Sequence, residues 1–436
     1  MFLKIKKFLR LFPPFSSYVL IRKLDRMRPT LERLVEDFSK IDEMNRIRTS
    51  LQDFSSLLVN TYVALGRTTA RHSPREAIDC FQRVLSFDPD APQARRYLSE
   101  VYVQIGDMQN ALNAICQALR ISPVRAVQEP SEASRLPAGT RPAKIYEPHA
   151  RITIATSLMP RRISEQKAAV RSWRRLGIDV ISVNNAHEIA ILKPEFPEVT
   201  FKEAAWTAEA QCGKPVVPTD EIIRFLSESD SPIVGIFNSD IVIEEGDGFL
   251  DAIRRQVPGS LVLSNRIDVD NAGSADGRLY AGGYDLFFFE RSACAIFASS
   301  GMIMGMPWWD FWMPLAAHLG SLKLKKLTST RALHYTHPIG YSFELFMSLS
   351  VPFSDSLASI ARAYPLMPGS ELATLTRGLF EAIDASVAAS GQALEPYEVG
   401  TLCSFVNFLI DHMSTSIRGD GGSQTVVGDE EVLESI

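Results

Sequence analysis

The chain has 436 residues, of which 46% are hydrophobic and 22% charged, and its formal net charge is −5. This length allows two or three domains, and the composition is that of an ordinary soluble globular protein. The negative net charge gives no reason to expect nucleic acid as a partner. The five cysteines (80, 116, 212, 294 and 403) lie far apart in the sequence, which argues against a zinc cluster or a disulfide framework and favours a cytoplasmic protein.

Residues 1–23 form a basic, amphipathic N-terminal segment. The first residues, MFLKIKKFLRLF, mix apolar and basic side chains without the uninterrupted apolar core of a secretory signal. As a helix, residues 1–12 can make a peripheral contact with the inner membrane face, or they can pack on the protein itself. The most apolar stretch, 297–320, contains Asp310, His318 and three glycines, so it predicts a buried segment rather than a membrane span.

Residues 24–123 predict an α-helical module with an internal repeat. The segment AIDCFQRVLSFDP (77–89) aligns with ALNAICQALRISP (111–123) at a spacing of 34 residues, so that Ala77 pairs with Ala111. This pattern resembles the tetratricopeptide repeat, in which small residues let two helices pack closely and a proline ends the second helix. The resemblance implies a groove for a partner protein; the alternative is a helical platform that braces the neighbouring domain.

Residues 124–150 lack periodicity and predict a linker, after which residues 151–350 alternate between strand and helix patterns. Strands are predicted at 152–157, 178–184, 199–204, 233–243 and 260–269, and helices at 163–176, from about 187, at 221–229 and at 249–257. This order predicts an α/β fold with a mostly parallel, nucleotide-binding sheet flanked by helices. Residues 351–415 predict C-terminal helices, and residues 416–436 a disordered tail.

Three polar residues lie within the predicted strand 233–243. The apolar run Ile233–Phe237 is typical of a strand buried on both faces, and Asn238, Ser239 and Asp240 follow it. Ligands of open α/β sheets bind beyond the carboxyl ends of strands, where a carboxylate can hold a hard cation and, through it, a diphosphate. Asp240 is therefore a candidate metal ligand, although an aspartate in such a position can also cap a turn.

Three more features follow in chain order. The segment 280–285 contains a pair of glycines, which lets backbone approach a ligand or forms a plain turn. Asp310 follows two tryptophans, so burial would raise its pKa towards the range of a general base; alternatively, it starts a helix whose tryptophans lie in the core. His334 and His337 follow a predicted strand, and imidazole suits Mn²⁺ better than Mg²⁺.

The order of these four features resembles the A-type glycosyltransferase fold (GT-A) across about residues 150–345. The resemblance implies transfer of a hexosyl group from a nucleotide-sugar donor with a divalent metal, Mn or Mg, on Asp240, His337 and His334. The family motif is typically Asp-any-Asp, whereas Asn238 replaces the first carboxylate here. Because an asparagine offers only a neutral oxygen, this departure puts metal binding in doubt.

The site residues predicted on this basis fall into three groups. Donor or nucleotide contacts are predicted for Thr156, Ser157, Arg162, Asn184, Asn238, Ser239 and Arg266, and an acceptor or sugar loop for Gly282, Gly283, Asp285 and Trp309. Asp310 is the predicted catalytic base, and inversion is slightly favoured because the chain shows no obvious second nucleophile. Several of these residues have plain alternatives, such as a solvated helix face for Arg162 and a core position for the tryptophans.

Two other hypotheses stay open. One is a non-catalytic adaptor whose repeats bind a partner protein and whose transferase-like domain has lost metal binding, as Asn238 suggests. The other is a metal-dependent phosphoesterase, which would need clustered carboxylates and histidines near the first strand; ITIATSLMP (152–160) has none. The sequence leaves a glycan, a lipid-linked sugar and a protein side chain open as acceptor, and the amphipathic N-terminus slightly favours a membrane-associated one.

Overall fold

The computed structural model describes residues 44–123, 146–246, 248–270, 277–298, 300–328, 332–337, 340–364, 370–391 and 393–418. The predicted segment 1–23, most of the linker 124–150 and the tail from 419 lie outside these residues. The chain divides into two compact units, Met1–Ala94 and Arg95–Ile436, which we describe one at a time. Among the described residues, no helix has both the length and the apolar character needed to cross a membrane.

In the first unit, helix α3 (Met44–Thr69) packs against helix α4 (Pro74–Phe87). Leu58 and Tyr62 of α3 share a small buried core with Val84 of α4. The chain is helical here, as the sequence predicts, and the identity of the repeat stays a prediction.

The next two helices are α5 (Pro92–Gln104) and α6 (Met108–Ala118), and α6 lies wholly within the second unit. The second unit also contains three long helices near the C-terminus: α13 (Phe343–Ala363), α14 (Glu371–Ser390) and α15 (Pro396–Met413). Leu112 of α6 packs on Gly378 of α14, where an added Cβ would lie 2.9 Å from the Leu112 side chain. Helix α6 thus completes the core of the C-terminal helices, since Ile115 and Leu379 belong to one buried cluster.

The main sheet of the second unit has eight strands in the order β12-β10-β6-β9-β4-β1-β2-β3. Their bounds are β1 Ile152–Thr156, β2 Asp179–Asn184, β3 Thr200–Glu203, β4 Ile233–Phe237, β6 Ser260–Ser264, β9 Leu286–Glu290, β10 Lys323–Leu327 and β12 Thr415–Ile417. The sheet is mixed, because β9 runs antiparallel to both of its neighbours while the remaining pairs are parallel. Strand β12 lies where the sequence predicted the disordered tail to begin.

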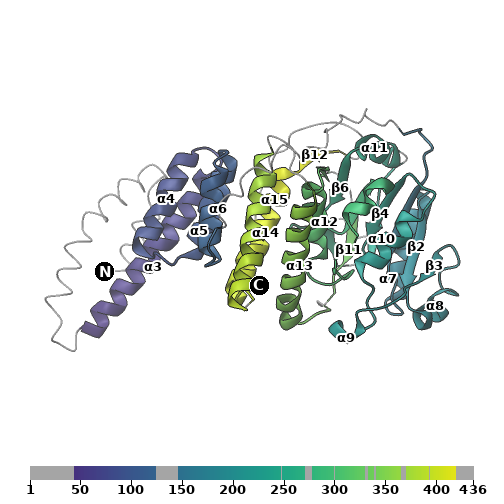
Figure 1. Ribbon diagram of the computed structural model, residues 1–436, viewed down its shortest axis with the longest axis horizontal. Helices are drawn as coiled ribbons and strands as arrows, with labels where there is room; N and C mark the ends of the chain where they lie inside the picture. The colour runs from purple at the N-terminus through teal and green to yellow at the C-terminus, as the bar shows by residue number, and fades with distance from the viewer. Residues whose placement is uncertain are drawn as a thin grey trace. The chain divides into compact units, whose positions relative to one another are not determined.

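Helices cover both faces of this sheet (Figure 1). One face packs with α7 (Ile163–Arg175) and α11 (Phe249–Gln256), and the other with α10 (Thr219–Ser227) and α12 (Trp309–Leu319). Three short helical segments complete the unit: α8 (Ala186–Leu192), α9 (Glu209–Cys212) and η2 (Arg291–Ile296). Successive β9 side chains alternate between the two cores, which confirms the predicted layers of an α/β fold.

A second sheet has four strands in the order β5-β11-β7-β8. They are β5 (Ile241–Ile243), β7 (Arg266–Val269), β8 (Arg278–Tyr280) and β11 (Ala332–Tyr335). The prediction of one continuous strand over 233–243 and one over 260–269 was wrong, because both break where the chain passes from the large sheet to the small one. At these breaks, Asn238 and Asn265 bond to the segment 283–285 instead of extending a strand pairing.

Candidate functional site

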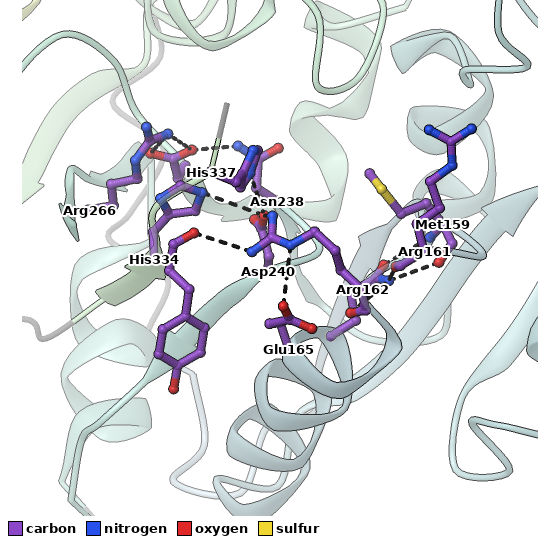
Figure 2. Close-up of polar contacts among 12 residues, drawn as sticks. Met159, Arg161, Arg162, Glu165, Asn238, Asp240, Arg266, His334 and His337 are labelled. Atoms are coloured by element: carbon purple, nitrogen blue, oxygen red, sulfur yellow. Dashed lines mark hydrogen bonds and ion pairs between the residues drawn. The ribbon is translucent and has the colours of Figure 1, made fainter. Parts of the chain in front are cut away.

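The two breaks and strand β11 bring Asp240, His334 and His337 together (Figure 2). Nε2 of His334 lies 3.5 Å from Oδ2 of Asp240, and Nε2 of His337 lies 3.3 Å from the same oxygen. The ligand atoms that the three side chains offer all lie within 4.8 Å of one another. The sequence named these three residues as metal ligands, and the structure places them in one cluster with mixed oxygen and nitrogen donors.

A carboxylate that the sequence analysis missed contacts the ring nitrogen of His334 that faces away from Asp240. Its Nδ1 lies 2.9 Å from Oδ1 of Asp268, while Nε2 faces Asp240. A carboxylate on the second ring nitrogen is the usual way in which proteins orient a metal-binding histidine. The cluster therefore fits a divalent cation such as Mn²⁺, which accepts both carboxylate and imidazole. The only sequence signal for Asp268 was its place in the predicted strand 260–269.

Protonation follows from the same contacts. Burial alone would raise the pKa of Asp240, but hydrogen bonds from His334 and His337, together with their charge, hold it below its usual range. Burial would lower the pKa of His334, yet Asp240 and Asp268 raise it to about 9. At neutral pH a proton therefore occupies this cluster, and a cation that binds there must displace it.

Arg162 lies on the other side of Asp240. It precedes α7 in a left-handed conformation with φ 51°, and its Nη1 lies 3.4 Å from Oδ2 of Asp240. Its Nη2 donates to the backbone oxygen of Tyr335 at 3.2 Å. The guanidinium thus places positive charge beside Asp240, where it can meet phosphate oxygens and also competes with a cation for the carboxylate.

The remaining residues predicted on the first two strands lie at the carboxyl ends of β1 and β2. Thr156 is fully buried, and within the described residues its hydroxyl has no hydrogen-bond partner. Asn184 is also buried, and its Nδ2 donates to the backbone oxygen of Leu158 at 2.6 Å and lies 3.5 Å from the hydroxyl of Ser157. These contacts tie the ends of β1 and β2 together, and the donor-binding roles of these residues stay predictions.

Asn238 does not present its amide nitrogen to Asp240. Its Nδ2 donates to Oδ1 of Asp285, and its backbone N–H donates to the backbone oxygen of the same residue at 2.9 Å. Asn238 therefore fastens the end of β4 to the start of β9. Its neighbour Ser239 is 8% exposed, so it has little surface to offer a donor.

Arg266 is held by protein groups on several sides. Its Nε donates to Oδ1 of Asp268 at 2.8 Å, and its Nη1 donates to Oδ1 of Asp285 at 3.2 Å. The guanidinium carbon lies 4.1 Å from the centre of the Tyr280 ring. The predicted diphosphate contact would have to compete with these partners.

Asp310, the predicted base, lies in the first turn of α12 against the glycine segment. Its Oδ2 accepts from the backbone N–H of Tyr284 at 3.3 Å. A Cβ at Gly283 would collide with this oxygen, so the contact requires glycine. Gly282 lies under the Tyr280 ring, whose hydroxyl would be 3.1 Å from an added Cβ.

Burial, and secondarily the charge of Asp285, raises the pKa of Asp310 to about 7, although backbone hydrogen bonds oppose the shift. Tyr280 and Tyr341, which are 36% and 38% exposed, are close enough to sense its charge. Burial raises the pKa of Cys403 in α15 to about 12, so this neighbour is neutral at pH 7. A carboxylate in such surroundings is suited to accept a proton.

Trp309, which the sequence analysis placed in an acceptor or sugar loop, takes the alternative position in the core. Trp309 is 2% exposed and packs edge to face on Phe287, with 5.5 Å between ring centres, so it is a core residue. The exposed rings near Asp310 are Tyr280 and Tyr341, which the sequence analysis did not select. Tyr341 had no sequence signal, because 31 positions separate it from Asp310 along the chain.

No protein-family model matches this sequence, and no curated protein matches it. Among solved structures, a mannosyltransferase from Pyrobaculum calidifontis, in complex with GDP-Man and Mn²⁺, is similar over 74% of this chain and 98% of its own, with 12% identity and a TM-score of 0.33. A mannose-1-phosphate geranyltransferase from Thermus thermophilus is similar over 39% of this chain and 62% of its own, with 9% identity and a TM-score of 0.24. Because both TM-scores are below 0.5, neither likeness bears on the function of this chain.

Proposed function

We propose that this chain transfers a hexosyl group from a nucleotide-sugar donor to an acceptor hydroxyl. The observation that carries the proposal is the pairing of two different carboxylates at one edge of the sheet. Asp240 lies among two histidines and an arginine, whereas Asp310 lies among buried neutral groups and near the charge of Asp285, with its pKa raised to about 7. A donor site and a base site are what glycosyl transfer needs, and the order of motifs in the sequence supports the same class of reaction.

On the donor side, Asp240, His334 and His337 would hold a divalent cation. Such a cation, when bound, neutralises the charge that develops on a leaving diphosphate. Arg162 adds a second positive charge beside Asp240, and its planar group can bridge two phosphate oxygens. Ser157 follows β1, one of the strands whose ends lead to this place, and is only partly buried, so we retain it as a donor contact.

On the acceptor side, Asp310 would accept the proton of the attacking hydroxyl. As that oxygen bonds to the anomeric carbon, the bond from this carbon to the diphosphate oxygen breaks, and the proton ends on the carboxylate. A single displacement of this kind inverts the anomeric centre. The carboxylate is held by the backbone N–H of Tyr284 and rests on Gly283, so its position is fixed before substrate binds.

The helices of residues 44–123 have a separate role in the proposal. We propose that they bind a partner protein or brace the second unit, and the packing of Leu112 on Gly378 supports the bracing role for α6. The acceptor class stays open between a glycan, a lipid-linked sugar and a protein side chain.

The proposal is tested by thermal unfolding of the full chain with a panel of UDP- and GDP-sugars, with and without MnCl₂. A ligand that binds only the native state raises the melting temperature. We expect a Mn²⁺-dependent increase with one donor class, which Asp240→Asn abolishes. Asp251→Asn is the matched control, because Asp251 pairs with Arg254 on α11, outside the candidate site.

Turnover is then measured as release of nucleoside diphosphate from the donor so identified. Release that requires Asp240 supports the transferase, and binding without release would favour the non-catalytic adaptor. No increase in melting temperature with any donor would contradict the proposed donor site.

A further inference from the structure

Arg266 lies between the candidate metal ligands and the candidate base. Its Nε donates to Asp268 at 2.8 Å and its Nη1 donates to Asp285 at 3.2 Å. Its side chain is 21% exposed, and the aromatic face of Tyr280 lies 4.1 Å from its central carbon. These contacts hold the guanidinium in one place, with a carboxylate on each of two sides.

Asp268 contacts one of the candidate metal ligands, whereas Asp285 lies next in the chain to a residue that contacts Asp310. Asp268 contacts Nδ1 of His334 at 2.9 Å, and the opposite nitrogen of His334 faces Asp240. Asp285 follows Tyr284, whose backbone N–H donates to Asp310. Asp285 also accepts from the side chain of Asn238, two positions before Asp240.

The charged and titratable groups around Asp310 come from several elements. They are Asp285 at the start of β9, Tyr280 of β8, Tyr284 before β9, Tyr341 before α13, Cys403 of α15 and, beyond Tyr280, Arg266 of β7. Burial raises the pKa of each tyrosine and of the cysteine, so these groups are neutral at pH 7. Among the described residues, the negative charge that faces Asp310 is therefore that of Asp285, and Arg266 is its salt-bridge partner.

We propose that Arg266 is a positioning residue that joins the two halves of the site, because it fixes Asp268 against His334 and neutralises Asp285 beside Asp310. Its significance in catalysis rests on the proposed function, but its effect on Asp310 does not. A diphosphate ligand would need this guanidinium free, whereas here it is committed to two carboxylates. The same arginine therefore maintains the orientation of a metal-binding histidine and the proton affinity of the base.

Removal of this charge has two consequences. In Arg266→Met, the charge of Asp285 faces Asp310 without compensation, so the pKa of Asp310 rises further above its ordinary range. Asp268 is also released from its salt bridge, so His334 loses part of its fixed orientation. Because Asp268 itself remains, metal binding should weaken by less than the about 10- to 100-fold that loss of a metal ligand's own hydrogen-bond partner typically costs.

The first measurement is the pH dependence of thermal unfolding of the full chain without donor or metal. At each pH from about 5 to 9, the melting temperature of the Asp310→Asn variant is subtracted from that of the chain with Asp310. The midpoint of this difference along the pH axis gives the apparent pKa of Asp310. We expect the midpoint of this difference to move up by about one pH unit in Arg266→Met, and by less in Arg266→Lys, which keeps the charge. An unchanged midpoint in Arg266→Met would overturn the proposal.

Arg162→Met is the matched control, because it also removes one arginine charge from the candidate site, but this arginine pairs with Asp240 and not with Asp285. It should leave the Asp310 midpoint in place; an equal shift would mean that the effect is general rather than specific to Arg266.

A second measurement keeps the test decisive if Arg266→Met does not fold. Asp285→Asn removes the negative charge and should lower the Asp310 midpoint; an unchanged midpoint would also overturn the proposal. Calorimetric titration of Arg266→Lys with MnCl₂ alone should show weakened binding, and unchanged affinity would contradict the link to His334. These readouts involve no donor, so their failure is distinct from failure of the proposed transferase.

Discussion

Asp240 and Asp310 lie in different halves of the candidate site and have opposite surroundings. Asp240 is met by His334 and His337, whose hydrogen bonds and charge hold its pKa low against the effect of burial, and Arg162 lies on its other side. Asp310 is met by buried neutral groups and by Asp285, and its pKa is raised to about 7. One residue type is thus held as an anion in one place and has its proton affinity raised in the other, and the difference comes from burial and from the neighbouring groups.

The sharpest test of this contrast is Asp310→Asn. An amide keeps the shape and can still accept from the backbone of Tyr284, but it cannot take a proton. We expect kcat to fall by about 10³-fold, within the range of general-base contributions, while donor binding stays close to that of the wild type. Steady-state kinetics together with donor titration checks this, and a kcat within about threefold of the wild type would exclude Asp310 as the base.

The pH dependence of kcat is the next test, because it separates the two carboxylates. Asp310 works only when deprotonated, so kcat should rise about tenfold per pH unit up to its pKa of about 7 and then level off. Asp240, with its lowered pKa, stays ionised across this window and should add no inflection. Rates measured from about pH 5 to 9 decide this, and a flat profile would contradict the assignment.

Replacing Asp310 and replacing Asp240 by asparagine should change the free energy of unfolding at pH 8 in opposite directions. Burial raises the pKa of Asp310 from its ordinary 3.8 to about 7, so the folded state holds a proton that the unfolded chain releases, and stability is lost as pH rises through this window. Asp310→Asn removes this loss and should stabilise the protein at pH 8 by about 2 kcal/mol, roughly half of what the full pKa difference would give, because Asp310 is only partly buried by surface area.

Asp240 has a lowered pKa, so its contribution is present above its ordinary value and is lost as pH falls below that value. Asp240→Asn should therefore destabilise the protein at pH 8. Both variants are compared by thermal unfolding at pH 4 and pH 8. Shifts of the same sign at pH 8 would contradict the proposed difference between the two carboxylates.

The cluster of Asp240, His334 and His337 was largely predictable from the sequence. An apolar run that ends in Asp240, within alternating strand and helix patterns, indicates the carboxyl edge of a sheet, and His334 and His337 followed in a recognisable order. The break at 238–240 was not predictable, because apolar residues flank it on both sides and only a partner elsewhere in the chain, Asp285, explains it.

The surroundings of Asp310 depend on contacts between distant segments, which periodicity does not encode. The sequence analysis named Asp310 and expected its pKa to rise, but it placed Trp309 in the acceptor or sugar loop. Helix α12 is apolar on nearly every side, so its sequence does not show which of its aromatic side chains would be buried. There was therefore no reason in the sequence to prefer an exposed tyrosine elsewhere over Trp309. The packing of α6 on α14 escaped prediction for the same reason, because Gly378 becomes informative only when Leu112 lies against it.

The smallest expected effect comes from the backbone beneath Asp310. In Gly283→Ala, the added methyl group would collide with Oδ2 of Asp310, so the carboxylate must move. A displaced base should lower kcat by about tenfold without preventing folding, because proton transfer depends steeply on geometry. Gly282→Ala is the matched control: its methyl group would meet the Tyr280 hydroxyl at 3.1 Å, the tip of a partly exposed side chain that can move, so the loss should be smaller. Equal losses in the two variants would show that the glycine segment acts through its flexibility rather than through the position of Asp310.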